Sequence, residues 1–449
     1  GMRFFVTTGN HDPALPLGHA KKNAHFLAAD GSRVTREDSC AGYVSQMECY
    51  ADFGFFPRKD DCYWESPFTS YTYDKYAYED ACRESVLGKR TYTLCDSLTA
   101  TDASYLVEPV DGLWLLAIDG GVYLPKEMKE GKWTYQGSSA GYNLVLKHKP
   151  FLLPWVRKVV EEARKRHKTL VAFSHYPLVD FNDGVSESVR RMWGDRRFDL
   201  HRVPEAEVSE AFLQAGLRLH FAGHMHVNDT GIWEGKDGKH LYNIQVPSIA
   251  TYVPAYKILT IENDEVFRVE TVTLDTVPGF DSLFPLYRAE YQSDSLRGYS
   301  PVWNKEILSA RTYGEFCDYQ FRDLVRLRFI PRDLPESWRA CLDFTGARML
   351  KAVSGEDKAN NANWTGWCMK DLVLDVYRLR YAERLALKDI PETRLAAYRY
   401  LFDRARISPL RSAEVEIVNG LGTLFLAFLD GEPCQNFVID LEKDTITGD

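Results

Sequence analysis

The chain has 449 residues, 45% of them hydrophobic, and a formal net charge of −9. At about 150 residues per domain this length allows two or three domains with a sizeable apolar core. The negative charge argues against a nucleic-acid-binding face built on phosphate contacts, and the lack of any run of about 18 apolar residues argues against a membrane-spanning helix.

A polar loop follows the first apolar run of the chain. The run at residues 4–6 predicts a strand over residues 3–8, directly followed by Gly9-Asn10-His11-Asp12. An amide, an imidazole and a carboxylate at a strand end are typical of a metal or acid–base site. Because Asn and Asp are also favoured N-cap residues, a helix cap is the alternative interpretation.

Residues 13–108 form a predicted insertion between this loop and the next core strand. The insertion is rich in aromatic residues, which either form its own core or contact a substrate above the loop from which it springs. It also holds five of the nine cysteines, which fit either scattered thiols or the disulfides of an oxidising compartment: Cys40, Cys49, Cys62, Cys82 and Cys95. The compartment stays open, with an extracytoplasmic location among the alternatives.

A strand–helix–strand pattern comes next. Residues 113–118 are continuously apolar and predict a buried strand, and apolar residues three or four positions apart predict a helix over residues 152–165. Residues 169–173 predict another strand, which leads into Ser174-His175. These two residues cannot form a Ser–His nucleophile pair, because neighbours on an extended strand point to opposite faces.

The same alternation occurs once more. Pro204 and Gly216 bound a predicted helix, and the strand 217–222 leads into Gly223-His224-Met225-His226. Three further strands follow and fit the second sheet of a two-sheet sandwich flanked by helices: 242–246, 256–261 and 267–272.

The character of the chain changes at about residue 276, where Pro, Asp and Ser mark a linker. Residues 304–350 and 366–405 look mostly helical. Three strand-like runs then predict a terminal β-meander: 414–418, 423–428 and 436–440. We therefore expect one domain over residues 1–275 and an accessory domain over residues 276–449 with a structural or partner-binding role.

The polar motifs occur in an order that resembles the calcineurin-like metallophosphoesterase superfamily. G-N-H-D lies at residues 9–12, a lone His at 175 and G-H-x-H at 223–226, each after a predicted strand. The resemblance implies an α/β (α+β) fold in which a two-sheet sandwich is flanked by helices. It also implies a centre of two divalent metal ions at the strand ends.

The resemblance implies a role for each polar residue of these motifs. It makes Asn10, His175 and His224 ligands of one ion and His226 a ligand of the other, while His11 is the catalytic acid that Asp12 orients. Imidazole and amide donors suit Mn, Fe or Zn, and two such ions lower the pKa of a bridging water and neutralise charge on a phosphoryl group. The expected function is a metal-dependent phosphatase or phosphodiesterase acting on a small phosphoester.

Two motifs of that family are missing. D-x-H and G-D-x-x-D should precede Gly9, and eight residues cannot hold two strand–loop units. Gly194-Asp195 and Asp199-Leu200-His201 occur in reversed order in one charged stretch, so we expect a solvated segment there and no metal ligands. Gly1-Met2 is typical of a tag residue before a start codon, which predicts an N-terminally truncated domain, with a natural relic as the alternative.

The missing motifs leave two classes of function open. The first is a phosphoester hydrolase that is impaired in this chain and holds at most one metal ion, weakly; the second is a non-catalytic binding protein on the same fold. Strand 3–8 is expected to be an exposed sheet edge or to pair with a neighbouring molecule, because the missing strands leave backbone groups unpaired. The sequence does not determine the substrate or the oligomeric state.

Overall fold

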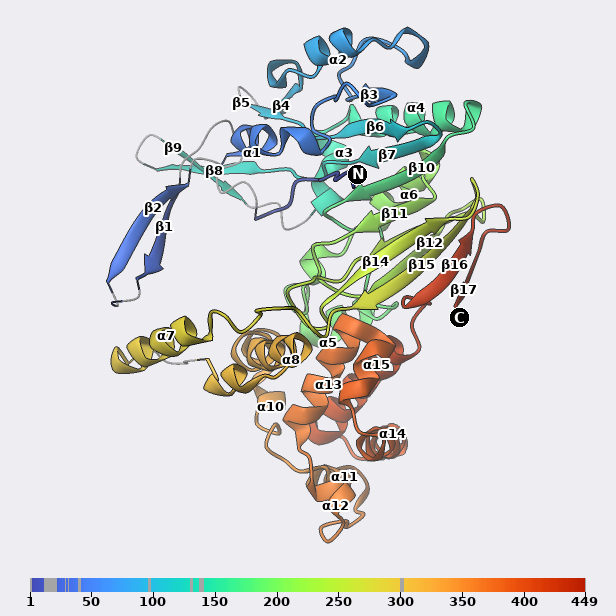
Figure 1. Ribbon diagram of the computed structural model, residues 1–449. Helices are drawn as coiled ribbons and strands as arrows, with labels where there is room; N and C mark the ends of the chain where they lie inside the picture. Colours follow the sequence, from blue (N-terminus) through green and yellow to red (C-terminus); the bar gives the residue numbers. More distant parts are fainter. Residues whose placement is uncertain are drawn as a thin grey trace.

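A seven-stranded mixed sheet organises the computed structural model, which describes residues 2–11, 22–28, 30, 32–38, 42–95, 98–129, 132–136, 141–298 and 303–448 (Figure 1). The strand order is β12-β13-β11-β10-β7-β6-β3. Four adjacent strands are parallel: β7 (Leu113–Ala117), β10 (Thr169–Ser174), β11 (Leu219–Ala222) and β13 (His240–Gln245). The outer strands are antiparallel to their neighbours: β3 (Tyr63–Glu65), β6 (Tyr105–Val110) and β12 (Asp229–Glu234).

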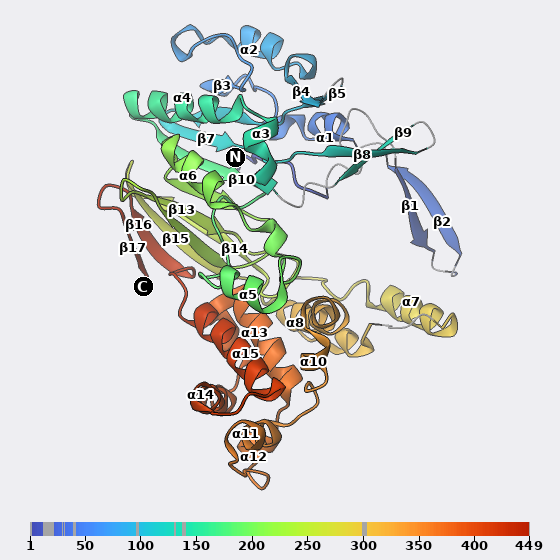
Figure 2. The ribbon, with the colours of Figure 1, turned by 180° about the vertical axis from the view of Figure 1, so that it is seen from behind.

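Two helices cover one face of this sheet, as the alternation of strands and helices predicts. They are α4 (Leu152–Lys165) and α6 (Ala206–Gln214), and Figure 2 shows them in front of the sheet. Val156 and Phe212 bury their side chains in one apolar cluster with Leu116 and Ala172 of the strands. Each helix crosses over between two parallel strands, which brings the carboxyl ends of β7, β10 and β11 to the same edge of the sheet.

A four-stranded antiparallel sheet packs on the other face. It consists of β14 (Ala255–Ile261), β15 (Val266–Thr273), β16 (Asn436–Asp440) and β17 (Thr445–Gly448), in that order. Val171 and Ile244 of the first sheet contact Phe267 and Phe437 of the second in one buried cluster. The predicted strands 256–261 and 267–272 therefore lie in the second sheet. The strand predicted at 242–246 is confirmed as β13, but its assignment to the second sheet is wrong, since β13 belongs to the first.

The predicted β-meander is wrong. Residues 414–418 and 423–428 lie in one helix, α15 (Ala413–Leu429), and only 436–440 forms a strand. The Ser412 side chain caps this helix by accepting a hydrogen bond from the backbone N–H of Val415. Most side chains of α15 are buried between other helices, so its sequence has short apolar runs that periodicity cannot assign to helix or strand.

The predicted strand 3–8 is also absent. Residues 2–9 carry no strand pairing; the Val6 N–H donates to Phe53 O and the Tyr105 hydroxyl donates to Val6 O. Phe5 and Val6 pack against a buried aromatic cluster. These residues are apolar because they pack against this cluster. The expectation that residues 3–8 form an exposed sheet edge is therefore wrong.

Part of the predicted insertion contributes to the core. β3 and the first four residues of β6 fall within residues 13–108, and both strands join the seven-stranded sheet. Aromatic residues of the insertion pack on each other and on Trp114: Tyr63, Tyr71, Tyr73 and Tyr76. These four rings form a core and not a substrate surface. Cys49 is disulfide-bonded, and the thiols of Cys62, Cys82 and Cys95 are free.

Short elements complete this half of the molecule. The strands are β1 (Lys22–Leu27), β2 (Arg33–Asp38), β4 (Thr91–Cys95), β5 (Leu98–Thr101), β8 (Leu124–Lys129) and β9 (Lys132–Gln136), paired as three hairpins. The helices are α1 (Tyr43–Cys49), α2 (Tyr78–Glu84), α3 (Val145–His148) and α5 (Ser186–Trp193).

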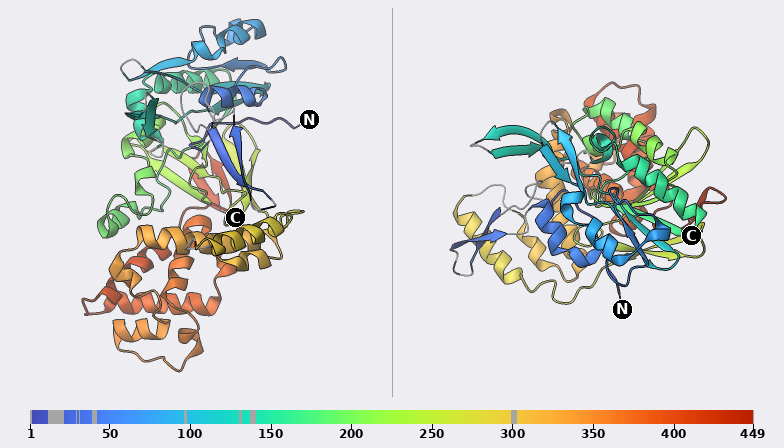
Figure 3. Two further views of the ribbon diagram at one scale, coloured as in Figure 1. Left: turned by 90° about the vertical axis from the view of Figure 1, so that its left-hand side faces the viewer. Right: turned by 90° about the horizontal axis from the view of Figure 1, so that it is seen from above.

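The C-terminal helices gather at the end of the molecule opposite α2 (Figure 3). They are α7 (Phe284–Leu296), α8 (Tyr313–Leu324), α9 (Ile330–Asp333), α10 (Glu336–Arg339), α11 (Gly346–Ser354), α12 (Ala362–Thr365), α13 (Met369–Ala382), α14 (Glu392–Ile407) and α15. Their apolar cluster includes Phe198, Val227 and Tyr252 from the sheet half. The boundary at residue 276 stays a prediction, because the two parts share this cluster and the second sheet. Within the described ranges, no helix has the length and apolarity that crossing a membrane requires.

Candidate functional site

Two neighbouring parallel strands place the predicted histidines side by side. Ser174 at the end of β10 is paired with Ala222 at the end of β11. The next residues continue this alignment, since the Gly223 N–H donates to His175 O over 3.0 Å. His175 and His224 therefore leave the sheet at the same edge, where binding sites of parallel sheets commonly form.

Three donor atoms converge at this edge. His175 Nε2 lies 2.8 Å from Asn10 Oδ1 and 3.0 Å from His224 Nδ1. The single proton on Nε2 would have to serve both the amide oxygen and His224 Nδ1, which leaves neither with a full hydrogen bond. A cation that accepts a lone pair from each of the three atoms would satisfy all of them. The donors, one amide oxygen and two imidazole nitrogens, fit Mn, Fe or Zn.

The backbone holds these side chains in costly conformations. His224 and His226 both adopt left-handed backbone angles, with φ of 65° and 59°. A Cβ atom on Gly9 would come within 3.1 Å of the His175 ring, so only glycine lets the first loop approach this closely. Conformations of this kind cost about 1–3 kcal/mol each and cluster at functional sites.

The histidines are neutral at pH 7. Burial lowers the pKa of His175 to about 4, with His226, His11 and Arg202 adding to the effect. Burial and the neighbouring His175 ring lower the pKa of His224 to about 2. Burial also lowers the pKa of His226. Neutral rings keep the lone pairs that metal coordination requires.

The structure brings only part of the predicted centre together. His175 contacts both Asn10 and His224. His226 lowers the pKa of His175 but makes no hydrogen bond to these three residues among the described contacts. His11 is exposed at the end of the first loop, and Asp12 lies outside the described residues. In the described part of the chain, the carboxylates do not join these histidines in a group of three or more His, Cys, Asp or Glu ligands. The roles assigned to His11, Asp12 and His226 stay predictions.

A buried charge network holds the chain just before the loop. The Thr8 hydroxyl lies 3.0 Å from the Tyr43 hydroxyl and 3.5 Å from Asp119 Oδ1. Lys149 Nζ donates to both Asp102 and Asp119 at 2.8 Å, and its side chain is fully buried. The turn at Asp119 was visible in the sequence as the end of a strand. Its partner Lys149 had no signal, because the pairing is made across the fold.

The sequence also gave no indication of Arg202. This guanidinium lowers the pKa of His175, His224 and His226, which places positive charge beside all three. Its Nε is buried without a hydrogen-bond partner and lies 3.9 Å from Asp199. A positive side chain with a free donor next to a metal-type centre fits an anionic ligand.

The charged stretch that the sequence predicts to be solvated is so only in part: residues 194–196 are exposed, whereas residues 198–200 are buried. Asp199 is buried and accepts two hydrogen bonds from Arg332, at 3.0 and 3.1 Å. Its carboxylate is therefore paired with arginine. Asp195 is exposed and pairs with Arg190.

No protein-family model matches the chain, and no curated protein matches it. The functional interpretation therefore depends on the geometry of the site.

Proposed function

We propose that the chain is a metal-dependent phosphoester hydrolase on a fold of the metallophosphoesterase type. The observation that carries the proposal is the convergence of Asn10 Oδ1, His175 Nε2 and His224 Nδ1 at the ends of adjacent chain segments. These atoms come from the G-N-H-D, lone-His and G-H-x-H motifs in the order found in that superfamily. Mixed α/β layers with parallel strands leading into two of the motifs support the same assignment.

The chemistry follows from the donors and their surroundings. A Mn, Fe or Zn ion held by Asn10, His175 and His224 would act as a Lewis acid toward water and toward a phosphoryl oxygen. Arg202 supplies a guanidinium that hydrogen-bonds phosphate oxygens and orients the ester. His11, exposed on the first loop, would donate a proton to the departing alkoxide, a contribution of about 10²–10⁴-fold.

A second candidate is a non-catalytic protein that binds a metal ion and an anion. It is favoured by one observation: among the described residues, the histidine centre gains no carboxylate that could bridge two ions. Without such a bridge, efficient generation of hydroxide is not expected, and the chain would hold a phosphoester without turning it over.

Metal content and hydrolysis together test the proposal. Chelator-treated protein is reloaded with Mn or Zn, its metal content is measured by inductively coupled plasma spectrometry, and release of nitrophenol is followed from aryl phosphate mono- and diesters. We expect about one ion per chain at the histidine centre and slow, metal-dependent release. Bound metal without turnover would favour the binding protein, and protein that binds neither Mn nor Zn would refute both.

Three variants separate the roles of the histidines. His224→Ala should lose both metal and turnover, whereas His11→Ala should lose turnover and keep its metal, because His11 is assigned as an acid and not as a ligand. His167→Ala removes an exposed histidine outside the centre and should change neither. Metal loss in His11→Ala would show that its role is misassigned.

A further inference from the structure

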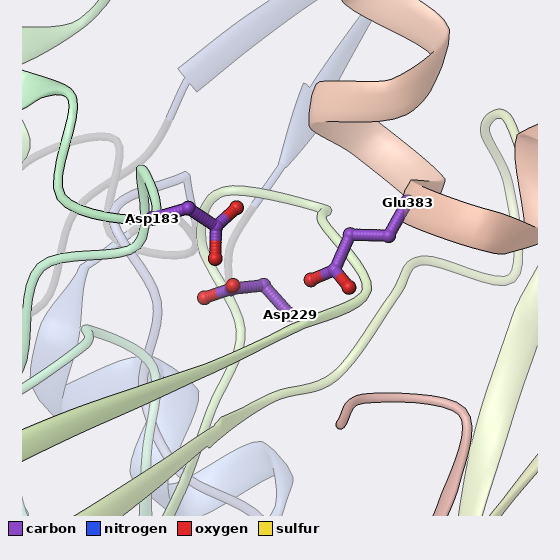
Figure 4. Close-up of side chains that lie close together, drawn as sticks. All are labelled: Asp183, Asp229 and Glu383. Carbon is purple, nitrogen blue, oxygen red and sulfur yellow. The ribbon is translucent and has the colours of Figure 1, made fainter. Parts of the chain in front are cut away.

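Three carboxylates from distant parts of the chain meet outside the histidine centre (Figure 4). Asp183 lies in the loop that follows β10, Asp229 begins β12, and Glu383 follows α13. Figure 4 shows the three carboxylate groups turned toward one another, and one oxygen of each lies within 4.8 Å of the others. We call this group the acidic cluster.

Two carboxylates of the acidic cluster are buried with unpartnered oxygens. Asp229 is 2% exposed and Glu383 is 3% exposed. Asp229 Oδ2 and Glu383 Oε1 are shielded from solvent and receive no hydrogen bond from another kind of group among the described residues, so the two carboxyls satisfy each other only by sharing a proton, and burial raises the pKa of both. None of the three carboxylates forms a salt bridge with another residue in the described ranges. A buried carboxylate without a compensating charge costs several kcal/mol, so the arrangement calls for a positive partner.

A buried amide next to the cluster also lacks partners. Gln245 of β13 is fully buried, and both its Oε1 and its Nε2 are without a hydrogen bond. Gln245 is the direct cross-strand partner of Asp229, so the two side chains project from the same face of the sheet. The amide oxygen of Gln245 is therefore a further hard donor beside the cluster.

Burial raises the pKa of Asp229 and the charge of the buried Lys257 amino group lowers it, but Lys257 forms no salt bridge with the acidic cluster. Lys257 Nζ donates to Asn228 Oδ1, Thr271 Oγ1 and the carbonyl of Cys434, all neutral acceptors. Cys434 in turn donates its thiol proton to Glu383 Oε2, which leaves Oε1 free. Glu383 also lines a surface hollow with Pro433 and Cys434, which gives a small ion a route from solvent.

We propose that the acidic cluster binds one hard divalent cation, with calcium as the best match. All the donors are oxygens, which select calcium, magnesium or manganese over zinc. The donor atoms lie within 4.8 Å of one another, and three carboxylates in a buried site suit calcium, which takes protein oxygens as ligands, better than magnesium, which keeps several waters. The ion ties the loops that follow His175 and His226 to the C-terminal helices, and it is separate from the ion of the histidine centre.

Calcium binding to the whole chain tests this site. Chelator-treated protein is titrated with calcium chloride in an isothermal calorimeter, and its unfolding midpoint is recorded with and without calcium. We expect one calcium ion per chain and a rise in the midpoint of about 3 °C at saturation. Glu383→Gln and Asp229→Asn keep the side-chain shape and remove one charge each, so each should weaken calcium binding at least 10-fold and abolish the rise.

Two controls make the result specific. Glu432→Gln removes an exposed carboxylate beside Asp183 and should leave calcium affinity within about twofold of the wild type. Glu383→Gln should bind Mn at the histidine centre as the wild type does. The proposal is overturned if wild-type protein shows neither heat nor stabilisation with calcium, which would indicate that the carboxylates share protons. It is equally overturned if both cluster variants bind calcium normally.

Discussion

The histidine centre and the acidic cluster are attached to the same two loops, yet they differ in the charge of their donors. Asn10, His175 and His224 are neutral, and their contacts at 2.8 and 3.0 Å let a shared proton satisfy part of the centre when no ion is present. Asp183, Asp229 and Glu383 offer up to three negative charges, and proton sharing is their only relief without a cation. Neutral nitrogen donors select borderline transition metals, whereas carboxylates select hard ions. The two proposed sites would therefore place ions of different chemistry on adjacent loops of one sheet.

Replacing Lys149 should have the largest effect on stability, because this lysine is the cation of two buried carboxylates. It contacts Asp102 and Asp119 directly, whereas no lysine or arginine in the described part of the chain forms a salt bridge with the acidic cluster. Replacing Lys149 with Met leaves two buried carboxylates without their cation, and we expect the free energy of unfolding to fall by about 3–5 kcal/mol in urea titrations. Lys351→Met removes one partner of an exposed ion pair and should cost less than about 1 kcal/mol. Equal losses in the two variants would contradict this account of buried charge.

His220 is a buried histidine outside the histidine centre, so it shows how burial alone affects stability. It is fully buried between Ser174 and Asn243, and burial lowers its pKa to about 4. The unfolded chain takes up this proton near pH 6.5 and the folded chain only near pH 4. His220 therefore lowers stability as the pH falls between these values, by about 3 kcal/mol at pH 4.

Unfolding of chelated protein at pH 7.5 and pH 4 measures this effect. His220→Gln should show a difference between the two pH values that is smaller by about 3 kcal/mol. His167→Gln, at an exposed position, should behave as the wild type. A wild-type slope in His220→Gln would assign the pH dependence to other groups.

Ion selectivity tests the comparison directly. His175→Ala removes the ring that contacts both other donors of its centre, so Mn affinity should fall at least about 100-fold while calcium affinity stays unchanged. Calorimetric titrations with each ion measure both affinities. If a variant of either centre lost both Mn and calcium binding, the two centres would not be independent sites.

Arg202 should have the smallest effect, on anion binding alone. Its guanidinium lies beside the neutral histidines and has a free Nε. Arg202→Gln should weaken inhibition of hydrolysis, or direct binding, by inorganic phosphate about 10-fold without loss of Mn, because one charge-assisted contact is removed. Arg191→Gln, on the exposed face of α5, is the matched control. Lower Mn content in Arg202→Gln would indicate a structural role.

Elements with a local pattern of apolar residues could be predicted before the fold was known. The alternation from residue 113 to residue 222 predicts β7, α4, β10, α6 and β11, because helix and strand periodicities differ over windows of this length. It also placed His175 and His224 correctly just after parallel strands. Since such strands end at one edge of a sheet, their proximity followed from the alternation.

Two apolar segments could not be assigned from the sequence, because their apolar character comes from packing in the folded protein. α15 is apolar on most sides because other helices enclose it, so its short runs resembled strands. Residues 3–8 are apolar because they pack on a cluster without a partner strand.

The acidic cluster shows the same limit for a site. Asp183, Asp229 and Glu383 belong to no motif, and each looks like a surface carboxylate in its own segment. Glu383 reaches the loops only because the C-terminal helices share a core with the sheet half. A binding site built from single residues of distant segments leaves no local sequence pattern. Only the packing of the folded chain brings these residues together.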